Sequence, residues 1–166
     1  IWWDEGFTGF MARLPLGALL VASGHDTAPP VYYGVLHAWM ALAGDSEFAV
    51  RLPSALAGIL TIAVLMRLAR SLAGSRAALT VGVLLALSRV LVWYSQEVRQ
   101  YAFATLLAAA SLALAVALWR EKRWAWLGYV AVTLTGLLSQ YPFMGVLSTQ
   151  NLAAAVALIW SGPRRT

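Results

Sequence analysis

Two adjacent acidic residues near the beginning of the sequence are the first candidates for chemistry. Asp4 and Glu5 follow the pair Trp2-Trp3, and such tryptophans are typical of a membrane interface. A carboxylate in a low-dielectric environment can act as a general base, because burial and neighbouring charges tune its pKa. The pair could instead bind a metal ion, or it could be a solvated pair at the interface.

A histidine and an aspartate precede a double proline in the next polar segment. His25 and Asp26 lie just before Pro29 and Pro30, whose rings restrict the backbone and remove two hydrogen-bond donors. The loop would therefore be held rigidly, although an ordinary exposed turn is the simpler interpretation. A metal site formed by Glu5, His25 and Asp26 is a further hypothesis, for which the spacing is not diagnostic.

The densest polar run, residues 94–101, reads Tyr-Ser-Gln-Glu-Val-Arg-Gln-Tyr and joins two apolar stretches. If this run is helical, Tyr94, Glu97 and Tyr101 share one face. The Arg99 guanidinium could bind an anionic group such as a phosphate, because its planar fork matches phosphate oxygens. It could equally extend to lipid headgroups, as long basic side chains do near membrane surfaces.

Two further arginines lie close to or within apolar stretches. Arg51 precedes Leu52-Pro53-Ser54, and Pro53 suits the first turn of a helix. Arg51 could bind lipid phosphate generally or one lipid substrate specifically. Arg89 lies inside an apolar run, where a charge is costly and usually faces the helix bundle or extends to the interface.

Long apolar stretches must position these residues. The chain has 166 residues, of which 61% are hydrophobic and 11% charged, whereas a soluble domain is about a quarter charged. A spanning helix needs about 20 mostly apolar residues, and lipid offers backbone groups no partners. We therefore expect an all-α, polytopic transmembrane helical bundle. The five predicted spans are Leu52 to Leu65, Ala77 to Tyr94, Ala102 to Trp119, Trp124 to Leu138 and Phe143 to Trp160.

Charged residues divide between the two ends of these spans. The positive-inside rule assigns the basic end to the cytoplasm, so the acidic end is predicted to be extracytoplasmic. The chain has no cysteine, which excludes disulfides, thiolate zinc sites and a cysteine nucleophile. The basic end holds Glu121 and the basic residues Arg67, Arg70, Arg76, Arg120, Lys122, Arg123, Arg164 and Arg165. The other end holds the acids Asp4, Glu5, Asp26, Asp45, Glu47 and Glu97.

Residues 1–51 differ from the spans and are expected to form an extracytoplasmic first loop, ahead of a five-helix transmembrane region at 52–166. Gly6 to Ser23 mixes apolar residues with an arginine and a proline, and Pro30 to Gly44 is too short to span a bilayer. Both are predicted to be helices that lie along the outer interface. Because the chain does not begin with methionine, we also expect it to be a fragment of a longer protein.

Four short motifs follow one another along the chain. They are Asp4-Glu5, then Asp26-x-x-Pro29-Pro30-x-Tyr32-Tyr33, then residues 44–54, Gly-Asp-Ser-Glu-Phe-Ala-Val-Arg-Leu-Pro-Ser, and residues 93–101, Trp-Tyr-Ser-Gln-Glu-x-Arg-x-Tyr. In this order they resemble the family 39 glycosyltransferases. These are GT-C fold membrane enzymes related to protein O-mannosyltransferases and to the enzymes that add aminoarabinose to lipid A. The resemblance implies sugar transfer from a polyprenyl-phosphate donor at the outer membrane face, with inversion at the anomeric carbon.

The resemblance also implies roles for individual residues. Asp4 matches the catalytic acid of the family, whose proposed role is to take the proton from the acceptor hydroxyl. Arg99 and Arg51 would bind the donor phosphate. A divalent metal held by Glu5 or Asp26 with His25 could serve instead. The supporting residues would be Glu5, His25, Asp26, Tyr94, Glu97 and Tyr101.

Location and partners follow from the same resemblance. It implies a multi-pass protein of the bacterial inner, or plasma, membrane, with the active site on the extracytoplasmic side. The expected partners are the polyprenyl-phosphate sugar donor and membrane lipids, and nucleic acid is not expected. The acceptor could be a protein, a glycan or a lipid, and the sequence identifies neither it nor the sugar.

Three positions depart from the pattern of the resembling family. Ala28 stands where members often carry His or Lys, Gln140 stands where many have His, and Arg89 follows Ser88 where Pro is common. The Ala28 and Gln140 departures keep a non-catalytic membrane scaffold open as an alternative. A transporter or flippase for a lipid-linked substrate is a separate alternative. Transporters place charged groups near the bilayer midplane, whereas the acids here gather at one end.

Overall fold

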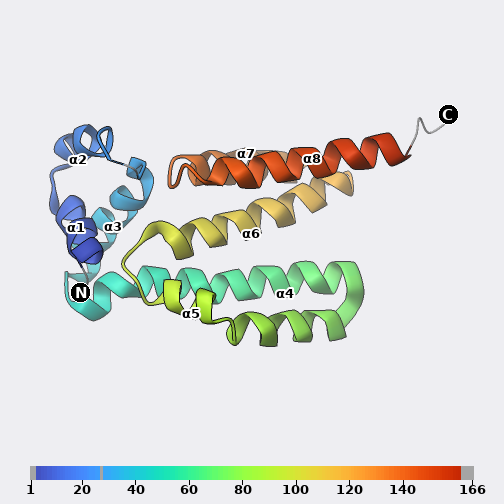
Figure 1. Ribbon diagram of the computed structural model, residues 1–166, viewed down its shortest axis with the longest axis horizontal. Coiled ribbons are helices and arrows are strands. Elements are labelled where there is room, and N and C mark those ends of the chain that lie inside the picture. Colours follow the sequence, from blue (N-terminus) through green and yellow to red (C-terminus); the bar gives the residue numbers. More distant parts are fainter. Residues whose placement is uncertain (1–2, 27, 162–166) are drawn as a thin grey trace.

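The computed structural model describes residues 3–26 and 28–161, which form helices joined by turns and contain no strand. The predicted all-α class is therefore confirmed. Figure 1 shows the short helices of the first part of the chain at one end of the molecule and the long helices lying side by side next to them. The helices are α1 (Trp3–Arg13), α2 (Leu16–Ser23), α3 (Pro30–Ala43), α4 (Glu47–Ala86), α5 (Arg89–Ser95), α6 (Gln100–Trp119), α7 (Ala125–Leu137) and α8 (Phe143–Ser161).

The first predicted helix, Gly6 to Ser23, is wrong as a single element. The chain forms α1 and α2 instead, with a break at Leu14 and Pro15. Pro15 has ψ 143, an extended conformation, and its ring cannot donate the hydrogen bond that would continue α1. The second predicted helix, Pro30 to Gly44, corresponds to α3, which ends where Gly44 adopts φ 80.

The longest helix, α4, is a hairpin rather than a straight rod. Its 40 residues include Gly74 with φ 86 and ψ −176, a conformation that is not helical and is essentially restricted to glycine. Figure 1 shows the chain reversing direction along α4, so that residues 75–86 return beside the first arm. The hairpin thus contains the predicted span Leu52 to Leu65 and the beginning of the next one.

The second predicted span, Ala77 to Tyr94, is interrupted. α4 ends at Ala86, and Ser88 begins the separate helix α5 by accepting a hydrogen bond from the Leu91 N–H at 3.4 Å. A serine at this position stabilises a new helix start because it satisfies a backbone donor that has no partner within the helix. Arg89 therefore lies exposed at the beginning of α5, not in the middle of a continuous span.

Pro53 lies inside α4 and not in its first turn, because the helix already begins at Glu47. A proline has no N–H, so the carbonyl of Ala49, four residues earlier, lacks its usual partner in the helix. The indole of Trp39 on α3 donates to this carbonyl at 2.8 Å. The proline thus frees an acceptor that fixes α3 against the beginning of α4.

Among the residues that the structure describes, three helices are long and apolar enough to cross a membrane: α4, α6 and residues 143–160 of α8. α7 is a shorter apolar helix, so the count of five spans stays a prediction. Gln150 on α8 accepts hydrogen bonds from Ser111 on α6 at 3.1 Å and from Tyr129 on α7 at 3.0 Å. Such polar contacts hold helices together where lipid provides no hydrophobic driving force between them.

The two ends of the bundle carry different elements. The short helices α1 to α3 lie beside the beginning of α4 and the turn between α5 and α6, while the Gly74 reversal and the end of α6 lie at the far end (Figure 1). The N–H of Val31 donates to the carbonyl of Leu138 at 3.1 Å, which also joins α3 to the end of α7. Motifs that are distant in the sequence therefore meet at one end.

Candidate active site

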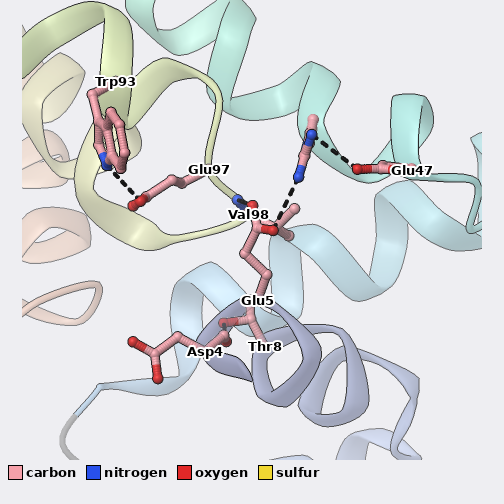
Figure 2. A network of polar contacts seen from close by, with 8 residues as sticks. Asp4, Glu5, Thr8, Glu47, Trp93, Glu97 and Val98 are labelled. Atoms are coloured by element: carbon pink, nitrogen blue, oxygen red, sulfur yellow. Dashed lines mark hydrogen bonds and ion pairs between the residues drawn. The ribbon is translucent and has the colours of Figure 1, made fainter. Parts of the chain in front are cut away.

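Glu5 is the buried centre of the polar end. Its side chain is 3% exposed and accepts from the Arg51 guanidinium at 3.1 Å and from the Val98 N–H at 3.0 Å. Figure 2 shows Glu5 reaching from α1 towards Val98. A buried carboxylate needs such charged and backbone donors, because an unpaired charge is expensive away from water. Glu5 thus ties α1 to α4 and to the turn between α5 and α6.

Arg51 lies between two carboxylates. It contacts Glu5 at 3.1 Å and Glu47, one helical turn earlier on α4, at 3.0 Å. The Arg51 side chain is 34% exposed, while Glu5 is enclosed. This arrangement makes Arg51 a partner that positions Glu5, and its predicted role as a phosphate ligand stays a prediction.

Asp4 faces a different direction from its neighbour. Figure 2 shows the Asp4 carboxylate pointing away from the Glu5 side chain, as expected for adjacent helical residues about 100° apart around the axis. The Asp4 side chain is 70% exposed and lies 3.7 Å from the Arg99 guanidinium. Of the two predicted acids, Asp4 is therefore the accessible one, and it lies next to a cation.

Arg99 is held in the turn between α5 and α6. Its side chain is 19% exposed, and its guanidinium lies 5.7 Å from the centre of the Tyr101 ring. Burial disfavours the charged form, but Tyr101 and Asp4 more than offset this, so the pKa of Arg99 is raised and the group stays cationic. Arg99 is therefore a fixed positive charge beside an open carboxylate.

The polar run 94–101 is not one helix, so the condition under which Tyr94, Glu97 and Tyr101 would share a face is not met. α5 ends at Ser95, and α6 begins at Gln100 after a turn. Tyr94 and Tyr101 nevertheless meet across the turn, with ring centres 4.8 Å apart. Glu97 accepts instead from the Trp93 indole at 2.6 Å (Figure 2).

The segment around the double proline contributes a hydrogen bond between Tyr33 and Asp26 to the site. The Tyr33 hydroxyl donates to Asp26 at 2.6 Å. Burial raises the pKa of Tyr33, and the hydrogen bond to Asp26 raises it further. His25 is exposed in the preceding turn. Ala28 is buried among Tyr32, Tyr33 and Val98, so the residue before the double proline packs in the core.

Tyr32 is a second tyrosine whose role the motifs did not reveal. Its hydroxyl lies 3.5 Å from Ser54 on α4, and its ring packs against Phe103 on α6. Desolvation raises the pKa of Tyr32 to about 12. The pair Tyr32-Tyr33 was visible as part of a motif, but only the packing shows that one hydroxyl holds α4 and the other holds Asp26.

Two clefts border this end of the bundle. One of about 130 Å³ is lined by Glu5, Arg51 and Glu97, together with Trp93 and Gln96. The other, of about 280 Å³, is lined by residues from α5, α6, the turn before α8 and the beginning of α8. The second cleft includes Tyr94, Tyr101, Gln140 and Phe143. Gln140, one of the departures from the family pattern, thus shares a cleft with the tyrosine pair.

The predicted metal ligands are not assembled. In residues 3–26 and 28–161, no group of three or more His, Asp or Glu side chains is placed to hold a metal ion together. Glu5 is bound by Arg51 and the Val98 N–H, and Asp26 by the Tyr33 hydroxyl. The set Glu5, His25 and Asp26 is therefore not a preformed site, and metal use stays a prediction.

The long helices are apolar, and acids, a cation and tyrosines gather at one end of them. This arrangement defines a polytopic membrane protein with a polar site at one end of its helix bundle. The family model for dolichyl-phosphate-mannose-protein mannosyltransferases matches residues 27–166. The chain therefore belongs to this family, which confirms the resemblance seen in its motifs. Members are membrane glycosyltransferases that use polyprenyl-phosphate sugar donors. None of the curated proteins and none of the solved structures compared with the chain matches it.

The matched stretch includes Arg51, Tyr94, Arg99 and Tyr101 but begins after Asp4 and Glu5. The family match therefore does not extend to the two early acids, and their predicted roles stay predictions. Both contact residues within the matched stretch, Asp4 through Arg99 and Glu5 through Arg51.

Proposed function

We propose that this protein transfers a sugar from a polyprenyl-phosphate donor to an acceptor hydroxyl at the outer membrane face, with inversion. The observation that carries the proposal is the difference in exposure between the adjacent acids Asp4 and Glu5. Asp4 is open and lies 3.7 Å from Arg99, whereas Glu5 is enclosed by Arg51 and the Val98 N–H. One acid is thus free to accept a proton beside a cation that can hold a phosphate.

The proposed step is a direct displacement. The acceptor oxygen forms a bond to the anomeric carbon as its proton passes to the Asp4 carboxylate. The bond from that carbon to the phosphate oxygen breaks, and polyprenyl phosphate leaves with the electron pair. The fixed charge of Arg99 stabilises this leaving group, so the protein supplies mainly a base, positioning and charge.

Other residues of the site would act by holding these groups in place. Glu5 and Arg51 fix α1 against the turn that carries Arg99, and Tyr33 fixes Asp26 nearby. A divalent cation could assist the leaving phosphate. Loss of transfer on treatment with a chelator, and its recovery on adding the metal, would establish that role.

The location on the outer face rests on charge. The end that carries Asp4 and Arg99 holds most acids of the chain. The basic residues at 67–76 flank the Gly74 reversal of α4, and those at 120–123 follow α6, at the opposite end. The positive-inside rule then favours an extracytoplasmic site. The bacterial plasma membrane is the proposed location. The variant Asp45→Cys would carry the only cysteine of this sequence. Its labelling by a membrane-impermeant thiol reagent in intact cells would report this orientation directly.

The test of the base is Asp4→Asn in the full-length protein, assayed in membranes with a panel of labelled polyprenyl-phosphate sugars. Loss of a general base should lower the transfer rate at least about 100-fold. Asp45→Asn is the matched control, because this acid is also exposed at the same end but pairs with Arg13. Full transfer by Asp4→Asn, in protein that inserts normally, would reject the assignment.

The same panel separates transfer from transport. A transporter or flippase would move the lipid-linked sugar across vesicles without forming a glycosylated product, and a scaffold would do neither. The family match and the gathering of Asp4, Arg99 and Tyr101 at one end favour transfer. The panel also identifies the sugar, while the labelled product identifies the acceptor as protein, glycan or lipid.

A further inference from the structure

A second charged cleft lies at the opposite end of the bundle from Asp4 and Arg99. It has a volume of about 370 Å³ and lies between the first arm of α4 and the second half of α6. Three basic residues line it, Arg67 from α4, Arg120 from the end of α6 and Lys122 from the following turn. Cations from separate elements thus meet at one cleft.

These cations are not neutralised within the described part of the chain. None of the ion pairs found there involves Arg67, Arg120 or Lys122. Arg120 is held in place by donating to the Ser71 carbonyl at 2.8 Å, which joins the end of α6 to α4. The nearest acid in sequence, Glu121, does not line the cleft. The cleft therefore presents positive charge that a bound anion would balance.

The rest of the cleft is apolar. Its lining includes Val64 and Leu68 on α4 and Ala110, Ala113 and Leu114 on α6. Ala110 precedes Arg120 by ten residues, which is a distance of about 15 Å along a helix at 1.5 Å per residue. A ligand that fits this cleft therefore has an anionic head and a long apolar tail that runs along the helices.

We propose that this cleft binds an anionic membrane phospholipid, with its phosphate at Arg67 and Lys122 and one acyl chain between α4 and α6. Basic pockets between transmembrane helices are known to suit such headgroups. Trp124 also lines the cleft and is 71% exposed, as expected of a tryptophan at the level of the lipid headgroups. A soluble phosphate would leave the apolar part of the cleft without a partner.

The experiment measures binding of phosphatidylglycerol and phosphatidylcholine to the delipidated full-length protein in detergent, by native mass spectrometry. The double variant Arg67→Gln/Lys122→Gln removes two lining cations. The control Arg70→Gln/Arg123→Gln removes the same charge from the same end without touching the cleft. We expect the first double variant to weaken phosphatidylglycerol binding roughly 30-fold. The control should change it less than about 3-fold.

A third variant tests the tail separately from the charge. Ala113→Leu narrows the apolar part of the cleft and keeps every cation, so it should also weaken phosphatidylglycerol binding. Glycerol phosphate serves as a headgroup without a tail and should not compete. The proposal would be overturned if both double variants lost phosphatidylglycerol binding equally or if neither lost it. Full phosphatidylglycerol binding by Ala113→Leu, or competition by glycerol phosphate, would also overturn it.

Discussion

The two ends of the helix bundle hold charge in opposite ways. At the end with α1 to α3, carboxylates and guanidiniums pair with each other, as Glu5 does with Arg51 and Asp4 with Arg99. At the other end, Arg67 and Lys122 line a cleft without a partner in the described residues. Paired charges hold a fixed geometry, which suits a reaction. Unpaired charges create a field, which suits the capture of an anion.

The largest stability effect should follow from breaking the buried pair at the acidic end. Glu5→Gln removes a charge that is 3% exposed and leaves Arg51 without its enclosed partner. We expect a loss of about 1–3 kcal/mol in the free energy of unfolding, less than for a fully buried pair because Arg51 reaches solvent. Unfolding in detergent micelles measures this change.

Glu47→Gln is the control for that prediction, because Glu47 pairs with the same arginine but its side chain is 57% exposed. It should cost no more than about 0.5 kcal/mol. If both variants lose the same stability, burial does not distinguish the pairs, and Glu5 is not the structural centre of this end.

The next effect concerns the basic end, whose geometry depends on a glycine rather than on ion pairs. Gly74 has φ 86 and ψ −176, so Gly74→Ala should strain the α4 reversal by about 1–3 kcal/mol. Gly145→Ala is the matched control, since a Cβ at Gly145 meets nothing within 4 Å and its helix tolerates alanine. Thermal unfolding in the same detergent compares them, and an unchanged midpoint for Gly74→Ala would contradict the strain.

A smaller, pH-dependent effect should appear at the acidic end. Burial raises the pKa of Tyr33 above its ordinary value of 10.0, so the folded protein favours the neutral hydroxyl. Stability from this group is therefore complete below about pH 10 and is lost as the pH rises through the higher folded pKa. Tyr33→Phe should lower stability at neutral pH but lose less of it as the pH rises from about 10 to about 11.

Unfolding midpoints across that pH range test the prediction for Tyr33. Tyr141→Phe serves as the control, since Tyr141 is 55% exposed and should leave the alkaline loss unchanged. An identical pH profile for Tyr33→Phe and the unmodified protein would show that the Tyr33 hydroxyl is not what ionises on unfolding.

The smallest effect is expected for the exposed pair at the acidic end. Arg13 and Asp45 lie 2.8 Å apart, but their side chains are 62% and 64% exposed. Solvent and salt screen such a pair, so Asp45→Asn should change the unfolding free energy by less than about 0.5 kcal/mol. A larger loss of unfolding free energy, measured at about 0.15 M salt, would contradict this. It would mean that the distance between the charges, rather than their burial, decides how much an ion pair stabilises this protein.

Composition and motifs predicted much of this molecule. The long apolar stretches indicated membrane helices, and the predicted span Ala102 to Trp119 agrees with α6 to within a few residues. The motif order indicated the family that the match over residues 27–166 confirms. These features could be predicted because hydrophobicity and charge order are local properties of the chain.

The packing of α5 against α4 was harder to predict because it depends on a contact between distant residues. The expected span Ala77 to Tyr94 divides into the end of α4 and α5, and a Cβ at Gly58 on α4 would overlap Ser95 on α5. Only the absence of that side chain lets α5 pack so closely. No pattern within residues 77–94 reveals a glycine that lies some twenty positions earlier.

By itself, the sequence determined that this chain is helical, lies in a membrane, and carries most of its acids at one end and most of its basic residues at the other. Only the tertiary structure decided which of two neighbouring acids is open to a substrate. Asp4 and Glu5 are chemically alike, but adjacent residues of a helix point in different directions. The Val98 turn and Arg51 cover one of these directions and leave the other exposed.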